Sequence, residues 1–286
     1  MELLLETNLP NLYYRGKVRD TYDLGDRLLI IATDRISAFD SVLPCGIPDK
    51  GVVLNLLSAF WFQKTAHLVP NHFIEVVEED KRYPYVASRS MIVRKARRID
   101  IECVVRGYLS GSAWAEYQER GAVADILLPK GLEESEKLPE PVFTPTTKAA
   151  SGHDQPITWE EMKGLLGKAQ AEELREKSLR IYRYVHDYAL ERDIIIADTK
   201  MEFGLVDDEA ILIDELLTPD SSRFWDASQY EVGCPQPSFD KQPVRDWLVA
   251  SGWNKEPPAP MLPPDVIEQT TQRYREAYRR LTGRTL

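Results

Sequence analysis

The chain has 286 residues, of which 43% are hydrophobic and 29% are charged, and its formal net charge is −10. These values are typical of a globular protein with one large or two modest domains. The acidic balance argues against a general nucleic-acid or membrane-surface binder, because such proteins need a basic face.

Cysteine usage and apolar runs indicate the compartment. The three cysteines, Cys45, Cys103 and Cys234, are odd in number, far apart and without metal-ligand spacing, which fits a reducing compartment. Residues 1–6 lack the basic start and long apolar region of a signal peptide. No run approaches the roughly 18 to 20 apolar residues that a membrane span needs. We therefore expect a soluble, cytoplasmic protein.

A strand pair with a glycine and two basic residues opens the chain. Residues 13–23 and 28–32 have the pattern of a hairpin, and the first segment carries Gly16, Lys17 and Arg19. A glycine lets the backbone approach a phosphate closely, and a neighbouring lysine supplies positive charge. One Gly-Lys pair is common, so a solvated turn stays an alternative for this segment alone.

The rest of the first hundred residues is predicted to be rich in strands, with one helix. Residues 33–40 follow the second strand and combine two acids, an arginine and a hydroxyl, as sites at strand ends commonly do. A helix is predicted over residues 55–66, and strands over 73–77 and 90–95. The basic run 94–98 is either a solvated connector or a hinge between two lobes.

Residues 101–114 have the composition of an anion site. A short apolar strand ends at Arg106, and Gly107 and Gly111 flank hydroxyl groups before a helix predicted over 113–120. An arginine with serines at a helix N-terminus suits a bound anion. A structural turn is the alternative.

A long loop is predicted over residues 129–156, which are rich in proline, glycine, glutamate and threonine. Residues 143–148 and 152–154 interrupt its acidic tract with specific polar groups. Long irregular loops in compact proteins are often lids or substrate loops.

Helices are predicted in the second half of the chain. Thr158 and Glu161 form a capping box that starts one helix, and a longer helix follows over 169–191. Two further helices, over 244–251 and 265–281, have the pattern of scaffold.

Two apolar runs around a short acidic turn form the most informative segment. Residues 194–205 and 210–213 have strand length, and an uninterrupted apolar run indicates a strand buried on both faces. Charged side chains nevertheless lie in or just beyond these runs, namely Asp198, Lys200, Glu202, Asp214 and Glu215. A buried carboxylate is costly unless a cation or a metal compensates it, and a divalent ion suits this set best.

The register of this hairpin decides which acid faces Glu202. A connecting loop with an odd number of residues places Glu202 and Asp214 on one face, where two carboxylates can hold one Mg²⁺. An even loop places Glu215 there instead. An ordinary hairpin with solvated edges is the alternative.

The polar loop 216–225 that follows includes Arg223, and its hydroxyls beside an arginine suit an anion such as phosphate.

Five motifs occur in order and span nearly the whole chain. They lie at residues 15–20, 34–40, 105–112, 198–204 and 214–223. Together they resemble the family of phosphoribosylaminoimidazole-succinocarboxamide synthase, or SAICAR synthetase. Residues 143–154 resemble the longer form of that family.

The resemblance implies an ATP-dependent ligase of de novo purine biosynthesis. Such an enzyme joins L-aspartate to the carboxylate of carboxyaminoimidazole ribonucleotide and releases SAICAR, ADP and phosphate, with ATP and Mg²⁺ as cofactors. The implied fold is α+β, with a β-rich, kinase-like nucleotide-binding lobe over residues 1–95. It packs on a larger α+β substrate and metal-binding lobe over 96–286, with a long loop over 129–157 and the ATP cleft between the lobes. We expect a monomer or homodimer that binds small molecules, and neither nucleic acid nor membranes.

The resemblance also assigns roles to the residues that match its motifs. The predicted cofactor-binding residues are Gly16, Lys17, Arg19, Arg94, Ala96, Glu202 and Asp214, of which Glu202 and Asp214 bind the metal. The predicted substrate-binding residues are Asp34, Ser37, Asp40, Arg106, Ser110, Ser112 and Arg223. Catalytic roles fall to Lys17, Lys200 and Asp198, and either Asp214 or Glu215 is the second metal ligand.

The chemistry explains why such residues are needed. A carboxylate is a poor acylating agent because its leaving group would be oxide, so ATP first converts it to an acyl phosphate that an amine attacks. Cations must then stabilise the phosphoryl group in transfer and position two anionic substrates.

Two other functions compete with this one. A kinase-like phosphotransferase for another small metabolite needs the Lys17 loop and the metal hairpin but no second anion site. A nucleotide-binding regulator without activity is opposed by the presence of every acid and base that the ligation needs. Phosphate release that requires both the ribonucleotide and L-aspartate separates the three functions.

Overall fold

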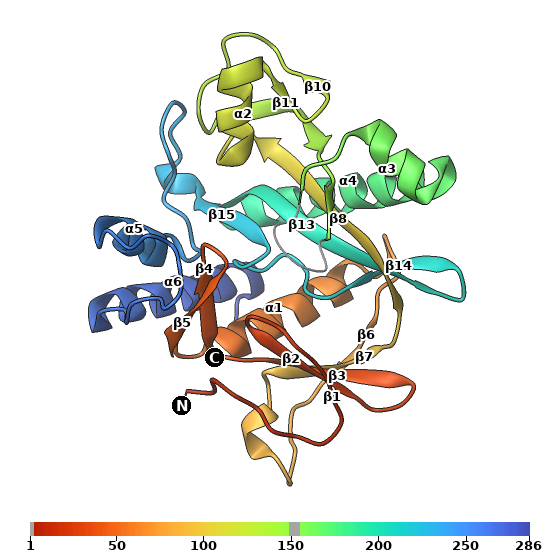
Figure 1. Ribbon diagram of the computed structural model, residues 1–286, viewed down its shortest axis with the longest axis vertical. Helices are drawn as coiled ribbons and strands as arrows, with labels where there is room; N and C mark the ends of the chain where they lie inside the picture. Colours follow the sequence, from red (N-terminus) through yellow and green to blue (C-terminus); the bar gives the residue numbers. More distant parts are fainter. Residues whose placement is uncertain (1–2, 149–154) are drawn as a thin grey trace.

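The computed structural model describes residues 3–148 and 155–286, which form a mixed α and β structure with antiparallel sheets (Figure 1). The predicted α+β class is therefore confirmed. Residues 1–2 and 149–154 lie outside the described residues, and with them the polar group predicted at 152–154. Every helix within the described residues is too short or too polar to cross a lipid bilayer.

The N-terminal part of the chain forms a five-stranded antiparallel sheet. Its strands, in spatial order, are β1 (Leu12–Arg15), β2 (Arg19–Asp23), β3 (Arg27–Ala32), β7 (Ser90–Arg94) and β6 (Phe73–Val76). Helix α1 (Lys50–Thr65) packs against this sheet, with Leu57 in one core with Ile30 and Val93. The helix predicted from residue 55 thus begins earlier, at Lys50.

A six-stranded sheet carries most of the predicted site. Its strands are β11 (Lys137–Phe143), β8 (Arg97–Tyr108), β13 (Ile194–Val206) and β14 (Glu209–Ile213), with β12 (Thr146–Thr147) on β8 and β15 (Ser222–Asp226) on β13. Strand β13 pairs with β8 on one side and with β14 and β15 on the other. Helix α4 (Lys168–Leu190) packs against β13 and β8.

The remaining elements flank these two sheets. They are the hairpin of β4 (Arg35–Ala38) and β5 (Ser41–Gly46), the 3₁₀ helix Pro84–Val86, α2 (Ser112–Arg120), β9 (Ala122–Val123), β10 (Ile126–Leu127), α3 (Trp159–Leu166), the 3₁₀ helix Ala227–Gln229, α5 (Gln242–Ala250) and α6 (Pro264–Thr282). The predicted capping box of Thr158 and Glu161 is confirmed at the start of α3. The C-terminal helices α5 and α6 pack on each other, and α6 also packs on α1.

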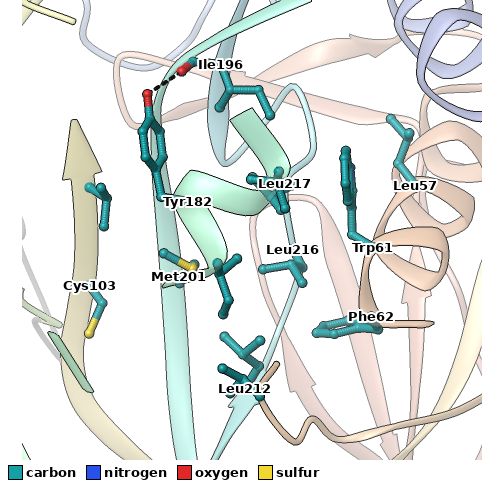
Figure 2. Packing of buried hydrophobic residues seen from close by; sticks show 14 of the residues in the cluster. Leu57, Trp61, Phe62, Cys103, Tyr182, Ile196, Met201, Leu212, Leu216 and Leu217 are labelled. Atoms are coloured by element: carbon teal, nitrogen blue, oxygen red, sulfur yellow. Dashed lines mark hydrogen bonds between the residues drawn. The ribbon is translucent and has the colours of Figure 1, made fainter. Parts of the chain in front are cut away.

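The largest hydrophobic core draws side chains from both halves of the chain (Figure 2). Trp61 and Phe62 of α1 share it with Leu216 and Leu217, which follow β14. A buried side chain of this size stabilises the fold by about 1.5–3 kcal/mol.

The division predicted between residues 95 and 96 falls in the connection from β7 to β8, and it stays a prediction.

The prediction of one long loop over residues 129–156 was wrong. Strands β11 and β12 lie within that range, and both pair with β8. Two prolines, Pro139 and Pro141, fall inside β11, where the register shifts between Lys137 and Val142. Proline lacks an N–H donor and is tolerated at a sheet edge or at an irregularity. The prolines therefore mark an irregular edge strand.

Candidate active site

The turn between β1 and β2 is held by a neighbouring arginine. Gly16 N donates to Arg19 O over 2.7 Å within the turn. Arg35 donates from Nη2 to the Gly16 carbonyl and from Nε to the Lys17 carbonyl, each over 3.0 Å. Its guanidinium also pairs with the buried Asp20 at 2.7 Å. Arg35 therefore fixes the backbone of the predicted phosphate loop, a role that sequence reasoning missed although Arg35 lies within one of the five motifs.

The ammonium group of Lys17 lies 2.5 Å from Asp40 Oδ1. Asp40 and Phe39 form the tip of the β4–β5 hairpin, and both have positive φ. Ser37 lies on β4 of the same hairpin, opposite Val42. Because the side chains of Lys17 and Asp40 are 52% and 56% exposed, this ion pair contributes little to stability. A phosphate can therefore replace Asp40 as the partner of Lys17 at little cost.

The hairpin of β13 and β14 has an even connection. Glu202 pairs with Ile213, and the two-residue turn consists of Asp207 and Asp208, which both have positive φ. Turns of this kind match the twist of the strands that they join. Of the two expected registers the structure has the even one, which is expected to place Glu215 rather than Asp214 on the face of Glu202.

The charge of Asp214 nevertheless acts on Glu202, although Asp214 lies beyond the end of the strand. Strand β14 ends at Ile213, and Asp214 has a φ of 68°. Its carboxylate Oδ2 lies 2.7 Å from Arg19 Nη2, and Glu215 Oε1 lies 3.4 Å from the same nitrogen. Both predicted alternatives for the second metal ligand thus share one guanidinium.

Four carboxylates and three cations surround this point, and we name them the acidic cluster. Its members are Glu102, Glu202, Asp214, Glu215, Arg19, Lys148 and Lys200. Lys148 Nζ binds Glu202 and lies 3.0 Å from Glu102 Oε1. Lys200 Nζ lies 2.6 Å from the same oxygen of Glu102. Glu102 and Glu202 pair directly across β8 and β13. Like charges in such a pair are destabilising, so the lysines are needed there.

Sequence reasoning missed Glu102 and Lys148. Glu102 lies inside the apolar run 101–105, the same signal that singled out Glu202. Lys148 ends the polar segment 143–148, whose chemistry is visible in the sequence but whose partners are not.

The two predicted metal ligands differ in their pKa because cations outweigh the effect of burial at Asp214 but not at Glu202. Burial raises the pKa of Glu202 to about 7, and the charge of Asp214 acts in the same direction while Lys148 opposes it. Burial also acts on Asp214, but Arg19 and the lysines outweigh it and hold the pKa of Asp214 below its usual range. Adjacent carboxyl groups with separated pKa values are typical of functional sites.

Arg106 and Arg223 meet on one carboxylate. Asp198 of β13 lies between Arg106 on β8 and Arg223 on β15. Arg106 Nη1 lies 3.0 Å from Asp198 Oδ2, and Arg223 Nη1 binds the same oxygen. Arg106 Nε also donates to Thr144 Oγ1 over 3.0 Å. The structure thus brings together residues from three separate motifs, and we name Arg106 and Arg223 the arginine pair.

The turn from Ser110 to Ser112 lies beside the arginine pair. Gly111 has a φ of 58° and a ψ of −130°, a conformation that favours glycine, and a Cβ there would push against Nη2 of Arg223. The Ser110 Oγ atom is buried and has no hydrogen-bond partner among the described residues. Helix α2 begins at Ser112 without a side-chain cap. Donors at a helix start next to an arginine suit an anion.

Three other predicted site residues make contacts within the protein. The buried Asp34 accepts hydrogen bonds from Leu4 N, Gly51 N and Arg89 Nη1, each at 2.9 Å. These contacts indicate a structural role, and a role in substrate binding stays a prediction. Arg94 donates to Asn71 O over 2.7 Å, and Ala96 lies against Gly204 in the connection between the two sheets.

One row of side chains on β13 joins the acidic cluster to the arginine pair. Asp198, Lys200 and Glu202 alternate along the strand and face one side of the sheet, whereas Met201 and Phe203 lie in the core on the other side. At about 3.3 Å per residue, Asp198 and Glu202 are about 13 Å apart along the strand. Lys200 lies midway.

The acidic cluster has the oxygen donors that Mg²⁺ prefers. Within residues 3–148 and 155–286, no three His, Cys, Asp or Glu side chains are grouped to hold a metal by themselves. A magnesium ion that serves a nucleotide commonly takes one or two carboxylates and the phosphates of that nucleotide. Glu202 and Asp214 meet this requirement, with their oxygens now bound to Lys148 and Arg19.

A cavity of about 1080 Å³ lies elsewhere, at the β6 edge of the five-stranded sheet. Its walls include the aromatic side chains of Phe60, Phe73 and Tyr83, and none of the predicted site residues. The acidic cluster and the arginine pair are more convincing as a reaction site than this cavity, because they combine charged groups with altered pKa values.

Known proteins resemble the chain over almost its whole length. A family model described as SAICAR synthetase matches residues 12–260. The phosphoribosylaminoimidazole-succinocarboxamide synthase of Thermodesulfovibrio yellowstonii is 53% identical over 289 residues, which are 98% of this chain and 99% of that protein. The enzyme of the same name from Syntrophobacter fumaroxidans is 50% identical, over 100% of this chain and 98% of that protein.

Solved structures give the same result. The SAICAR synthase of Saccharomyces cerevisiae in complex with SAICAR has a TM-score of 0.90 and 41% identity, over 99% of both chains. A SAICAR synthetase in complex with ADP has a TM-score of 0.72 and 26% identity, over 96% of this chain and 98% of that one.

Proposed function

The chain belongs to the SAICAR synthetase family, and from this premise we propose how its two clusters divide the reaction. The family's enzymes use ATP to join L-aspartate to carboxyaminoimidazole ribonucleotide in purine biosynthesis, and that ligation is the activity of this chain. In our proposal the acidic cluster and the Lys17 loop bind ATP with Mg²⁺. The arginine pair, with Ser110 and Ser112, binds the ribonucleotide.

The row on β13 is the observation that carries this proposal. Because Asp198 and Glu202 face the same side of one strand, both substrates can lie along one surface, with the ammonium of Lys200 between them. A cation at that position is suited to the phosphoryl group in transfer, where negative charge spreads over several oxygens. Two solved relatives, one in complex with SAICAR and one in complex with ADP, support a site of this kind in the family.

The reaction then proceeds in two displacements. A carboxylate oxygen of the ribonucleotide attacks the γ-phosphorus of ATP, and ADP leaves. The amine of L-aspartate, after losing a proton, attacks the acyl carbon, and the bond to the phosphate oxygen breaks. The released phosphate therefore carries one oxygen of the original carboxylate.

The protein's own groups account for the remaining needs. Lys17 supplies positive charge to the triphosphate, and Arg35 keeps its loop in place. Asp198 holds the two guanidinium groups at a fixed separation, so that they reach the ribonucleotide together. Magnesium, when bound to Glu202 and Asp214, neutralises charge on the phosphates. The oligomeric state, monomer or homodimer, stays a prediction.

Isotope transfer tests the proposed chemistry. Ribonucleotide labelled with ¹⁸O in its carboxylate is incubated with enzyme, ATP, Mg²⁺ and L-aspartate, and the released phosphate is analysed by mass spectrometry. We expect one labelled oxygen in each phosphate, and no phosphate when either the ribonucleotide or L-aspartate is omitted. Unlabelled phosphate would rule out the acyl phosphate route.

A further inference from the structure

Lys148 occupies the position where a metal would be expected. Its ammonium binds Glu202 and, at 3.0 Å, Glu102 Oε1. Its backbone N–H donates to Asp100 O over 3.1 Å, directly after β12 pairs with β8. The side chain is 25% exposed, so the ammonium lies in a partly dry site. The side chain of Lys148 therefore extends across β8 and reaches Glu202 on β13.

The charges of the acidic cluster explain why this lysine is needed. Among the residues that the structure describes, its four carboxylates contact three cations, and Arg19 is committed to Asp214 and Glu215. Lys200 contacts Glu102, which leaves Lys148 as the cation in direct contact with Glu202. Without Lys148, Glu202 would be a buried carboxylate without a bonded counter-charge, which is costly.

We propose that Lys148 and a divalent cation are alternative occupants of the Glu202 carboxylate, so that the metal enters by displacing the lysine. Glu102 then keeps the released ammonium close, because its Oε1 already binds Lys148. An ammonium and a divalent ion repel each other strongly in a site from which water is largely excluded, so both cannot stay on Glu202. This inference rests on the proposed metal role of Glu202.

The exchange has a consequence for the order of binding. An internal competitor lowers the apparent affinity for free metal by the fraction of molecules in which Glu202 is open. A metal that arrives with ATP brings phosphate ligands of its own and overcomes this competition. The enzyme then binds Mg²⁺ mainly together with the nucleotide.

Metal binding without nucleotide tests the proposal. Free Mn²⁺ is measured by electron paramagnetic resonance in titrations of the full-length wild type and of the variants Lys148→Met, Lys148→Arg and Lys200→Met. We expect Lys148→Met to bind Mn²⁺ about tenfold more tightly, as when a competitor that holds nine tenths of the sites is removed. Lys148→Arg keeps the competing charge and should bind as weakly as the wild type. Lys200→Met removes the same charge but leaves Lys148 on Glu202, so it should tighten Mn²⁺ binding by clearly less than Lys148→Met does.

A fourth variant, Glu202→Gln, separates failure of this proposal from failure of the proposed metal site. If Glu202→Gln binds Mn²⁺ as well as the wild type does, the metal role of Glu202 itself is wrong. If Glu202→Gln loses Mn²⁺ while Lys148→Met binds no more tightly than the wild type, the metal site stands and the exchange is wrong.

Melting curves give a second readout. Without metal, Lys148→Met should melt at a lower temperature than the wild type, and added Mn²⁺ should raise its melting temperature by more. Lys148→Gln replaces Lys148→Met if that variant does not fold.

Discussion

Replacing Arg106 by lysine keeps the charge but removes the planar, forked donor. In the structure Arg106 makes two bonds of 3.0 Å, one to Asp198 Oδ2 and one to Thr144 Oγ1, and its side chain is 13% exposed. A lysine ammonium has its three donors on one nitrogen and lacks the planar fork, so it cannot hold a ligand anion through two parallel bonds. The loss of a charge-assisted bond to the ribonucleotide costs about 1–3 kcal/mol, which is a roughly 5- to 150-fold increase in its KM.

The assay for Arg106→Lys is steady-state ADP release at saturating ATP and L-aspartate, with the ribonucleotide varied. The fold should survive, because Asp198 keeps its bond to Arg223, and we expect a fall in Tm of only about 2–4 °C. Arg183→Lys is the matched control, since Arg183 is exposed and its partner Glu140 lies 3.6 Å away. An unchanged KM for the ribonucleotide, or an increase in the KM for ATP alone, would refute the role given to the arginine pair.

Three further predictions concern the acidic cluster and the residues beside it. Glu202→Gln should lower kcat by about 100-fold or more and leave far-UV circular dichroism unchanged, and near-normal turnover at ordinary Mg²⁺ would contradict the metal assignment. Lys17→Ala should slow phosphoryl transfer far more than it weakens ribonucleotide binding; calorimetry that showed the ribonucleotide lost and ATP retained would mean that the two sites are exchanged. His72 is 3% exposed and its ring packs against Phe62, and burial lowers its pKa to about 3. A histidine with a depressed pKa in the folded state must fold without its proton, so stability should fall as pH drops from about 6.5 toward 3. Urea titrations across that range should give a flatter profile for His72→Gln, and equal slopes for the two proteins would show that His72 is not responsible.

The strands of the site could be predicted because their signals are local. Charged residues inside an apolar run stand out in a sequence, and this contrast pointed to Asp198, Lys200 and Glu202. Their alternation along β13 follows from strand geometry alone. The structure places all three on one face, as a regular strand requires.

The register of the hairpin could not be predicted, because it depends on backbone angles that the sequence does not fix. The turn is two residues long because Asp207 and Asp208 both adopt positive φ, which aspartate tolerates but does not require. Asp214 lies beyond the end of β14 with a φ of 68°, where the alternation of a regular strand no longer sets the direction of its side chain. The choice between Asp214 and Glu215 as the second metal ligand therefore stays a prediction.

Contacts between distant strands were also beyond sequence reasoning. Glu102 meets Glu202 because β8 lies next to β13, and strand order is set by the packing of the whole sheet. Lys148 reaches both acids only because β12 adds to β8. The sequence also does not show that Asp34 accepts hydrogen bonds from Leu4, Gly51 and Arg89, and its role in substrate binding stays a prediction.

A structure of the enzyme with Mg²⁺, a nucleotide and the ribonucleotide bound together is the most direct test of the two clusters along β13. We expect the metal on the carboxylate of Glu202, and the phosphate and carboxylate of the ribonucleotide within hydrogen-bond distance of Arg106, Arg223 or the Ser110–Ser112 turn. Lys200 should point at the space between the two ligands. A ribonucleotide bound far from Arg106 and Arg223, or a metal that does not touch Glu202, would contradict this division of the site.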